Sequence, residues 1–453
     1  MSKRFDYDLA VIGSGDAGGK AALIAAESGQ RVALIEANKW GGSSLNSSNV
    51  PYGALFHASQ IYKKALDGGK FGISSNGLRY NYPTMNSWKN TAMRRAKANS
   101  KAEFEEAGIT CIKGTARFIS KKELAVDDEV IQAKKYLIAT GASILDTGIK
   151  IPENVDYWLP EDALNILRPP RSLFIIGAGS TGCELAQYFA TLGTTVVIAD
   201  IAGRLLPRED EEVGQVMDDV FNKSKIKVLT QSRVIALEKD GQTKKVIFLR
   251  GGQEKSVRVD EVLMCTGSAP NVDIGLENAH VKYNRTGISV DITMRTSQKH
   301  IYAAGDVVGG HSSTEKAEME ARVAAMHLIG KSKAIADYRG IMRITDTYPE
   351  VAQIGETEDD CIRSDKKIKK VTVPLDTVVK ANISDTHNGF IKIIVSKKTN
   401  KLLGATIVSP SAGILAQELA FALCYELTAD NIALVPHLAN DWNALIREAC
   451  ERI

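Results

Sequence analysis

The chain has 453 residues, of which 44% are hydrophobic and 25% are charged, and its formal net charge is +3. These values indicate an ordinary globular protein of about three domains, at roughly 150 residues per domain, with enough apolar side chains for a large core. The balanced charge gives no sign of nucleic-acid or membrane partners. No apolar run approaches the ~18 residues of a membrane-spanning helix, which excludes such a helix.

The cysteines favour a reducing compartment. They form no CxxC motif and no close spacing, which suits reduced thiols better than a framework of disulfides. The first apolar run, Leu9–Ile12, leads directly into a glycine motif, so no secretory signal is expected. We therefore expect a cytoplasmic protein without a metal site. The cysteines are Cys111, Cys183, Cys265, Cys361, Cys424 and Cys450.

Two segments of the chain repeat each other. Residues 10–37 read AVIGSGDAGGKAALIAAESGQRVALIEA, and residues 174–201 read FIIGAGSTGCELAQYFATLGTTVVIADI. They align over 28 residues without a gap at an offset of 164, so that Gly13 falls on Gly177. A repeat of this kind indicates a duplicated structural unit.

Each copy has the order strand, glycine turn, helix, strand and acid. In the first copy, the apolar run Leu9–Ile12 predicts a buried strand of a parallel sheet. A helix with apolar periodicity follows the turn and ends at Gly29, and a second strand over Val32–Ile35 leads to the acid. The corresponding parts of the second copy are Leu173–Ile176, Gly193 and Val196–Ala199.

The three glycines of each GxGxxG turn have separate roles in binding a dinucleotide. The first makes the tight turn, the second lets backbone approach a pyrophosphate, and the third allows the helix to pack closely on the strand. The helix N-terminus attracts the phosphate charge. A lone GxGxxG is weak evidence, but the complete order of elements, found twice, favours two dinucleotide sites over two empty turns. The glycines are Gly13, Gly15 and Gly18 in the first turn and Gly177, Gly179 and Gly182 in the second.

The closing acids, Glu36 and Asp200, are suited to accept hydrogen bonds from a ribose diol. An acid at this position repels the 2′-phosphate of NADP, whereas an arginine would welcome it. Asp200 therefore favours NAD(H) in the second unit, although Arg204 follows close behind.

Further segments resemble a known family. Residues 40–53 read WGGSSLNSSNVPYG, and they resemble the redox loop GGTCxNxGCxPSK of class I pyridine nucleotide-disulfide oxidoreductases. That family includes dihydrolipoamide dehydrogenase, glutathione reductase and mercuric reductase. The resemblance spans essentially the whole chain. The other matching segments are ATG at 139–141, TGSAPN at 266–271, IYAAGD at 301–306 and DTYPEVAQIGETE at 346–358.

The resemblance implies an α/β protein with two Rossmann-like dinucleotide-binding domains and a C-terminal α+β dimer-interface domain. A discontinuous FAD-binding domain would comprise residues 1–143 and 268–335. An NAD-binding domain would comprise residues 144–267, and the dimer-interface domain residues 336–453. The resemblance thus implies FAD and NAD(H) as cofactors and a homodimer as the assembly.

The resemblance also implies roles for individual residues. Asp306 would bind the ribityl chain of FAD, and Glu184, which closes GxGxxGxE, would be a catalytic residue near the nicotinamide and the flavin. Without the family, Asp306 could equally be a turn residue, and Glu184 a helix N-terminal acid favoured by the dipole. The other positions expected around the cofactors are Gly42, Ser43, Ala116, Thr140, Gly141, Gly267 and Thr314.

The redox loop of this chain lacks sulfur. Ser44 and Asn49 stand where the family has its two cysteines, and Gly53 stands where it has a flavin-side lysine. Disulfide exchange requires a thiolate, so these residues exclude it at this site. Cys450 is a single thiol in the C-terminal tail, and Cys183 is expected to be a small buried residue.

The C-terminal segment departs from the family as well. Where the family reads HPTxSE, with a catalytic His–Glu dyad, residues 437–442 read HLANDW. His437 keeps the histidine, and Trp442 replaces the glutamate, which would make an acceptor cavity more apolar. Asp441 could orient His437 if the turn between them is helical. A structural histidine at a dimer seam remains as plausible as a catalytic one.

Two functions fit these residues. The first is an FAD-dependent NADH oxidoreductase that passes electrons from flavin to a small acceptor such as a quinone or a dye, since the hydride chemistry belongs to the cofactors. The second is a catalytically degenerate flavin- and NAD-binding homologue with a structural or sensing role. A transhydrogenase-like activity also stays open. Similarity over the whole chain would suggest dihydrolipoamide dehydrogenase, which the redox loop argues against.

Overall fold

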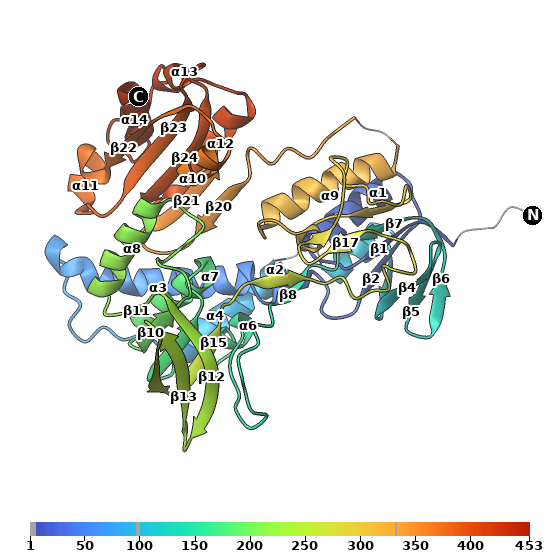
Figure 1. Cartoon of the computed structure of the whole chain (residues 1–453), viewed down its shortest axis with the longest axis horizontal. Helices are drawn as coiled ribbons and strands as arrows, with labels where there is room; N and C mark the ends of the chain where they lie inside the picture. Colours follow the sequence, from blue (N-terminus) through green and yellow to red (C-terminus); the bar gives the residue numbers. More distant parts are fainter. Residues whose placement is uncertain (1–5, 97–99, 331–332) are drawn as a thin grey trace, which may run out of the picture. The chain divides into compact units, whose positions relative to one another are not determined.

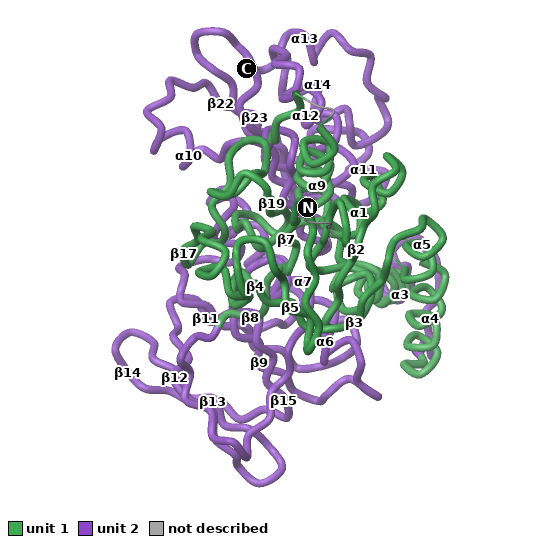
Figure 2. The backbone as a smooth tube through the Cα atoms, turned by 90° about the vertical axis from the view of Figure 1, so that its right-hand side faces the viewer, with its two compact units in different colours: residues 1–61, 81–145, 267–337 green, residues 62–80, 146–266, 338–453 purple. Residues whose placement is uncertain are grey.

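The computed structural model describes residues 6–96, 100–330 and 333–453 (Figure 1). The backbone groups into two compact units (Figure 2). Unit 1 comprises residues 1–61, 81–145 and 267–337, and unit 2 comprises residues 62–80, 146–266 and 338–453. The chain thus leaves unit 1 and returns to it twice, as in a discontinuous domain.

A five-stranded parallel sheet forms the centre of unit 1, with the strand order β19-β7-β1-β2-β3. Side chains alternate along β1, so Leu9 and Val11 join one hydrophobic cluster and Ala10 and Ile12 join another. Burial of both faces explains the continuous apolar runs of the sequence. The strands are β1 (Tyr7–Ile12), β2 (Val32–Glu36), β3 (Thr110–Lys113), β7 (Ala133–Ile138) and β19 (Ile301–Ala303).

Helices cover one face of this sheet and a small antiparallel sheet covers the other. Helix α1 (Asp16–Glu27) packs against α9 (Thr314–Leu328) through alanines that include Ala21 and Ala321. The antiparallel sheet has the order β4-β5-β6. Its strands are β4 (Ala116–Ser120), β5 (Glu123–Val126) and β6 (Glu129–Ile131). The other elements that begin in unit 1 are α2 (Gly42–Asn46), α3 (Asn49–Leu66), α4 (Tyr82–Arg95), α5 (Lys101–Glu106), β8 (Ala142–Ile144), β16 (Ser268–Pro270), β17 (Tyr283–Asn284), β18 (Gly287–Ile288) and η2 (Asp306–Val308).

Unit 2 repeats this two-sheet arrangement between residues 172 and 264. A parallel sheet has the order β11-β10-β9-β15, and an antiparallel sheet, β12-β13-β14, packs on one face through a shared hydrophobic cluster. The duplication seen in the sequence therefore extends to the second sheet. The elements are α6 (Pro160–Ala163), β9 (Ser172–Ile176), α7 (Ser180–Thr191), β10 (Thr195–Ala199), α8 (Glu211–Lys223), β11 (Lys227–Leu229), β12 (Ser232–Asp240), β13 (Thr243–Arg250), β14 (Gln253–Val259) and β15 (Glu261–Met264), and η1 (Asp67–Phe71) also belongs to unit 2.

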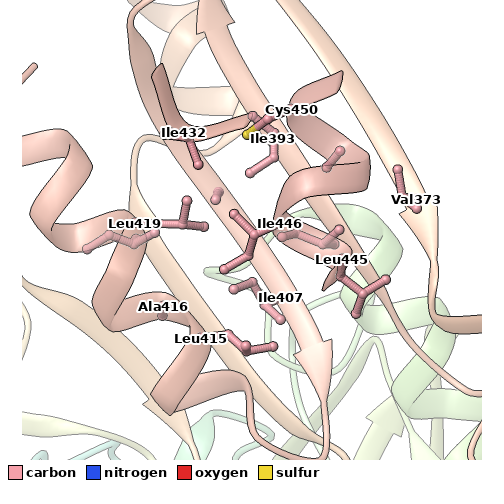
Figure 3. Packing of buried hydrophobic residues seen from close by; sticks show 14 of the residues in the cluster. Val373, Ile393, Ile407, Leu415, Ala416, Leu419, Ile432, Leu445, Ile446 and Cys450 are labelled. Carbon is pink, nitrogen blue, oxygen red and sulfur yellow. The ribbon is translucent and has the colours of Figure 1, made fainter. Parts of the chain in front are cut away.

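The C-terminal part of unit 2 is an antiparallel sheet with the order β20-β21-β24-β23-β22. Helices α12 and α14 contribute apolar side chains to a core on this sheet (Figure 3). The strands are β20 (Met342–Thr345), β21 (Glu350–Gly355), β22 (Ile368–Pro374), β23 (Phe390–Ser396) and β24 (Leu402–Ser409). The helices are α10 (Glu358–Arg363), η3 (Leu375–Thr377), α11 (Val379–Ser384), α12 (Ala412–Cys424), α13 (Ala429–Ala433) and α14 (Ala444–Arg452).

A buried ion cluster ties the start of α8 to the C-terminal sheet. The side chain of Lys392 on β23 is 1% exposed, and its Nζ lies 2.7 Å from Oε2 of Glu358 and 3.0 Å from Oε1 of Glu212. The same Nζ lies 3.6 Å from Oδ2 of Asp210, which also accepts a hydrogen bond from the hydroxyl of Thr406 (2.6 Å). The backbone nitrogen of Glu358 donates to Oδ1 of Asp210 (3.0 Å). We call these five residues the Lys392 cluster.

We expect Lys392→Met to lower the free energy of unfolding by about 3 kcal/mol, because the variant leaves the buried carboxylate of Asp210 without its counter-charge. Urea unfolding at pH 7 measures the change. Lys370→Met is the matched control, because Lys370 also pairs with Glu358 but its side chain is 48% exposed. An exposed pair contributes roughly 0–1 kcal/mol. Equal losses in the two variants would contradict the importance of the cluster.

The Lys392 cluster also predicts a dependence of stability on pH. Burial acts to raise the pKa of Glu358, but hydrogen bonds from Lys370 and Lys392 outweigh it, so that the pKa lies below its usual value. Such a carboxyl stabilises the fold above its unfolded pKa, and the contribution is lost as the pH falls through the folded pKa. Melting between pH 7 and pH 3 should therefore show a smaller acid-induced loss in Lys392→Met than in the native chain.

The predicted fold class is confirmed, with two Rossmann-like halves and a C-terminal α+β region. The predicted FAD domain largely coincides with unit 1, except that residues 62–80 group with unit 2. Residues 146–266 and 338–453 also group together, so the predicted boundary at residue 336 stays a prediction. None of the helices in the described residues combines the length and the apolar character that crossing a membrane requires.

Candidate cofactor sites

The first glycine turn has no room for side chains. Gly13 has a φ of +99°, and a Cβ there would lie 2.3 Å from the carbonyl oxygen of Ala139. A Cβ at Gly18 would lie 1.8 Å from the carbonyl oxygen of Gly13. Only glycine therefore permits this path of the backbone between β1 and α1.

The second glycine of the turn, Gly15, lies against the loop that opens α2. A Cβ at Gly42, which has a φ of +64°, would lie 2.6 Å from the Cα of Gly15. Gly15 is the N-cap of α1 and supplies no side-chain cap. The first amides of a helix have no acceptor within the helix, so an uncapped end of this kind suits an anion. Ser43, in the first turn of α2, is exposed.

Glu36 closes β2 and is 8% exposed. Its Oε2 accepts hydrogen bonds from the backbone nitrogen (2.9 Å) and the hydroxyl (2.6 Å) of Ser14, and its Oε1 accepts one from the backbone nitrogen of Asn38 (2.7 Å). The hydroxyl of Ser14 also accepts from the backbone nitrogen of Gly41 (3.0 Å). Oε1 keeps an acceptor position for a ligand hydroxyl. The sequence reasoning missed Ser14, which stands between the first two glycines of the motif.

The second glycine turn has the same steric logic. Gly177 has a φ of +108°, and a Cβ there would lie 2.2 Å from the carbonyl oxygen of Cys265. A Cβ at Gly182 would lie 1.9 Å from the carbonyl oxygen of Gly177. By contrast, a Cβ at Gly179 would meet no atom within 4 Å, and Gly179 caps α7 without a side-chain hydrogen bond. The backbone is therefore bare where a pyrophosphate would approach.

Asp200 follows β10 as Glu36 closes β2. Its Oδ2 accepts a hydrogen bond from the backbone nitrogen of Ala178 (2.6 Å), and its Oδ1 accepts one from the backbone nitrogen of Ala202 (2.7 Å). These donors lie 164 positions after Ser14 and Asn38, so the duplication retains both backbone bonds, while Ala178 lacks the hydroxyl that Ser14 adds. Each oxygen of Asp200 keeps an acceptor position for a ribose hydroxyl.

The arginine that follows the second closing acid has partners of its own. Nη2 of Arg204 donates to the carbonyl oxygen of Glu209 (3.0 Å) and lies 3.8 Å from Oδ2 of Asp359. Its stem packs against Gly214 of α8, where a Cβ would lie 3.1 Å from the Cβ of Arg204. The guanidinium is thus engaged by other acceptors.

The Gly305–Asp306 turn follows β19 directly. Gly305 has a φ of +83°, and a Cβ there would lie 3.0 Å from the Cβ of Ala17, in the first turn of α1. Burial raises the pKa of Asp306, and the charge of Lys316 and a hydrogen bond with Ser312 act in the opposite direction. The carboxyl group is therefore partly enclosed next to the helix that the first glycine turn opens.

Thr314 links two further predicted positions. Its hydroxyl donates to Oδ2 of Asp16 on α1 (2.7 Å) and accepts from Nδ2 of Asn49 (2.7 Å). Thr314 is the first residue of α9, and Asn49 is the first residue of α3. The three side chains therefore join the starts of α1, α3 and α9.

The remaining predicted positions in unit 1 are linked by hydrogen bonds to backbone atoms or occupy turns of the backbone. The hydroxyl of Thr140 donates to the carbonyl oxygen of Asn271 (2.7 Å), and the backbone nitrogen of Asn271 donates to the carbonyl oxygen of Gly141 (2.9 Å). Gly141 and Gly267 have φ values of +69° and +92°. Ala116 opens β4 and is buried, in the antiparallel sheet.

Comparison with known proteins identifies the family. Residues 7–326 match the family model described as pyridine nucleotide-disulphide oxidoreductase, and residues 341–442 match the dimerisation domain of that family. The chain belongs to the pyridine nucleotide-disulfide oxidoreductases.

The alignments with relatives cover nearly the whole chain. It is 31% identical to mercuric reductase of Staphylococcus aureus over 438 residues, 96% of this chain and 80% of the relative. It is 32% identical to dihydrolipoyl dehydrogenase of Bacillus subtilis over 432 residues, 93% of each chain. Among solved structures, LpdA from Mycobacterium tuberculosis superposes with a TM-score of 0.88 at 24% identity, over 98% of this chain and 99% of the other. The HOCl-induced flavoprotein disulfide reductase RclA from Escherichia coli gives 0.86 at 24% identity, with the same coverage.

Members of this family bind FAD and NAD(H), so the predicted cofactors are confirmed for the family. The residues of this chain fit both groups. Each glycine turn presents an uncapped helix end, and each closing acid, Glu36 or Asp200, keeps an acceptor position for a hydroxyl. The assignment of individual residues to the cofactors stays a prediction.

The two positions that correspond to the redox cysteines of the family lie on consecutive helices. Ser44 is in α2, and Asn49 begins α3. Gly53, in the first turns of α3, is exposed, and a Cβ there would meet no atom within 4 Å. Packing therefore does not exclude a lysine at this position, and no steric conflict explains why the chain has glycine there.

The six cysteines all lie in the described residues as free thiols. Cys450 is 4% exposed and lies beside Ile393 in the C-terminal core (Figure 3), where burial raises the pKa of its thiol to about 12. Burial also raises the pKa values of Cys183 and Cys265. A thiol must ionise before it can attack a disulfide, so these three are poor nucleophiles. The prediction that Cys183 is a small buried residue is confirmed.

Glu184 holds a loop of unit 2. It is 9% exposed on α7, and its Oε1 accepts a hydrogen bond from the backbone nitrogen of Asp346 (2.7 Å). One turn later, Gln187 donates to the carbonyl oxygen of Tyr348 (2.8 Å) and accepts from its backbone nitrogen (2.7 Å). Helix α7, which follows the second glycine turn, therefore fixes the segment after β20 through two polar side chains.

The condition under which Asp441 could orient His437 is not met, because residues 434–443 form no helix. Instead, Nε2 of His437 lies 2.8 Å from Oε1 of Glu418 on α12, and Nδ1 lies 2.6 Å from the carbonyl oxygen of Val435. Trp442 does not line an open cavity either, because it is 5% exposed and belongs to the C-terminal hydrophobic core.

Proposed function

We propose that the protein is an FAD-dependent NADH oxidoreductase that passes electrons from flavin to a small diffusible acceptor, such as a quinone, and that it does not reduce disulfides. One observation carries this proposal. Both glycine turns and both closing acids are intact, while the two redox positions hold Ser44 and Asn49.

In this proposal, the chain binds and orients its cofactors. The turn around Gly15, the carboxylate of Glu36 and the Gly305–Asp306 turn hold FAD, and the turn around Gly179 with Asp200 holds NADH. The bound cofactors supply the hydride and electron transfer themselves. The uncapped starts of α1 and α7 supply amide donors to the phosphates.

The catalytic roles of Glu184 and His437 stay predictions. The contacts of Glu184 favour a positioning role on the loop at Asp346. The side chain of His437 is 1% exposed, and both of its ring nitrogens have partners within the chain. These contacts support the reading of His437 as a structural residue.

We further propose a cytoplasmic homodimer. Six free thiols favour a reducing compartment. The dimerisation domain carries exposed apolar side chains on α12, where Ile414 is 78% and Phe421 61% exposed, and at Tyr425 directly after the helix, which is 66% exposed. Leu434 and Leu438, after α13, are exposed as well. Apolar patches of this kind mark interaction surfaces.

We expect the double variant Ile414→Glu, Phe421→Glu to be monomeric at micromolar concentration, because charges would be desolvated in the interface. Light scattering measures the mass. Leu167→Glu, at an 87% exposed leucine outside the dimerisation domain, is the control and should leave the dimer intact. If the double variant remains dimeric, the interface is formed by other residues.

We expect NADH to be preferred over NADPH roughly tenfold or more, because Asp200 would face the 2′-phosphate across a desolvated contact. The contacts of Arg204 support this expectation, because its guanidinium already faces the carbonyl oxygen of Glu209 and the carboxylate of Asp359 and not a 2′-phosphate. The measurement is the rate of anaerobic flavin reduction by each nucleotide, in the native chain and in Asp200→Asn. Equal rates with both nucleotides in the native chain would refute the role of Asp200.

An anaerobic titration of the purified protein with NADH tests the proposed function. Bleaching of the flavin, followed by reoxidation on addition of a quinone or dye, supports an oxidoreductase. A flavin that stays oxidised on the catalytic timescale favours the structural or sensing homologue. A protein that carries no flavin after reconstitution would rule out both.

A further inference from the structure

A buried ion pair lies behind the Gly305–Asp306 turn. Lys316 and Glu320 are four residues apart on α9, so their side chains share a face of the helix. Nζ of Lys316 lies 3.0 Å from Oε1 of Glu320, and the two side chains are 6% and 0% exposed. Both charges are therefore removed from water.

This pair holds both polar backbone atoms of one glycine. The backbone nitrogen of Gly305 donates to Oε2 of Glu320 (2.8 Å), and Nζ of Lys316 donates to the carbonyl oxygen of Gly305 (3.4 Å). The same carbonyl oxygen accepts from the backbone nitrogen of Val308 (3.1 Å), which closes the turn. The orientation of Gly305 is thus determined from both sides, at a φ of +83°.

A role in stability alone does not account for these two charges. Replacing a buried ion pair by well-packed apolar residues of similar volume is often neutral or stabilising. What the pair supplies and an apolar pair cannot is an acceptor for one peptide group of Gly305 and a donor for the other. The second of these peptide groups joins Gly305 to Asp306, on whose carboxyl the charge of Lys316 also acts.

We infer that Lys316 and Glu320 are positioning residues for FAD, which fix the peptide groups on both sides of Gly305 and with them the direction in which Asp306 presents its carboxylate. The inference rests on the proposed binding of FAD at Asp306. It adds two residues of α9 that do not themselves contact the cofactor but determine how well the carboxylate meets it.

The test measures the dissociation constant of FAD by flavin fluorescence, on full-length protein from which the flavin has been removed. The double variant Lys316→Met, Glu320→Leu keeps the buried volume, so the apo-protein should melt at the native temperature or above it. Its dissociation constant for FAD should rise at least about tenfold, which corresponds to about 1.4 kcal/mol. The single variant Glu320→Gln keeps an oxygen acceptor for the backbone nitrogen of Gly305, so its affinity for FAD should fall less than that of the double variant.

A comparison with Asp306→Ala shows whether the pair acts through the carboxylate. Asp306→Ala should weaken FAD binding in the native background but add little to the Lys316→Met, Glu320→Leu variant, because residues that act as a unit are not additive. Additive losses, an unchanged affinity for FAD, or a parallel fall in the melting temperature of the apo-protein would each overturn the inference. Failure of the native chain to bind FAD would instead overturn the proposed function on which it rests.

Discussion

Reduction of the protein by NADH without oxygen is expected to give plain reduced flavin, with no absorbance band from charge transfer between a thiolate and the flavin. NADH-dependent reduction of lipoamide or glutathione disulfide should be undetectable, while reduction of a quinone or dye proceeds. The physical reason is that the hydroxyl of Ser44 and the amide of Asn49 provide no sulfur nucleophile. Stopped-flow spectra and NADH consumption with each acceptor measure both outcomes.

Restoring the two cysteines provides the matched comparison. Ser44→Cys with Asn49→Cys should give at most feeble disulfide reduction, because Gly53 still lacks the lysine of the family. The open space at Gly53 makes Gly53→Lys sterically possible as a third substitution. Turnover of lipoamide by the native protein at a rate comparable to its dye reduction would contradict this view. It would require a thiol pair elsewhere, although four of the six thiols are buried with raised pKa values.

Gly182→Ala should abolish reduction by NADH while the FAD half stays loaded. A Cβ at this position would lie 1.9 Å from the carbonyl oxygen of Gly177, so the second turn has to open. Misplacing a bound reactant by about 1 Å can cost about a hundredfold in rate, and we expect at least that loss. The measurements are the rate of flavin reduction by NADH and the flavin content of the purified variant.

Two other glycines separate a steric effect at the nucleotide from damage to the fold. A Cβ at Gly203 would lie 3.7 Å from the nearest side-chain atom, an ordinary contact, so Gly203→Ala should behave as the native protein. A Cβ at Gly179 would meet no protein atom within 4 Å, so Gly179→Ala should melt at the native temperature. Its affinity for NADH should nevertheless fall, because the added methyl group occupies the approach of the pyrophosphate. Normal NADH binding by Gly179→Ala would argue against a nucleotide at this turn.

The dinucleotide units could be predicted from sequence because their signals are local. The strand, the GxGxxG turn, the helix and the closing acid occur within 28 residues, and each has its own steric reason. The predicted strand at Leu9–Ile12 lies within β1, and the predicted strand at Leu173–Ile176 lies within β9. The backbone donors to the closing acids could not be predicted, because they depend on the path of the following loop.

Contacts between distant segments were beyond sequence reasoning. The partner of His437 is Glu418, which lies 19 residues earlier on α12, whereas His437 lies in a loop, so no helical spacing relates the two. Asp441 lies four residues after His437, but the two residues are not on a helix, so this spacing does not bring their side chains together. The spacing of Lys316 and Glu320 is visible in the sequence, but their burial is not, and a surface salt bridge would have the same spacing.

The Lys392 cluster has a consequence for exchanging parts between relatives. Its lysine comes from β23, whereas Asp210 and Glu212 come from the start of α8, far away in sequence. A graft of residues 338–453 alone would therefore set a foreign side chain against two native carboxylates. A fragment that keeps these contacts includes Asp210 and Glu212 as well as the C-terminal segment, and it also includes Glu184 and Gln187, whose side chains bond the loop after β20. The cut points of a viable chimera therefore do not coincide with the end of the second glycine unit.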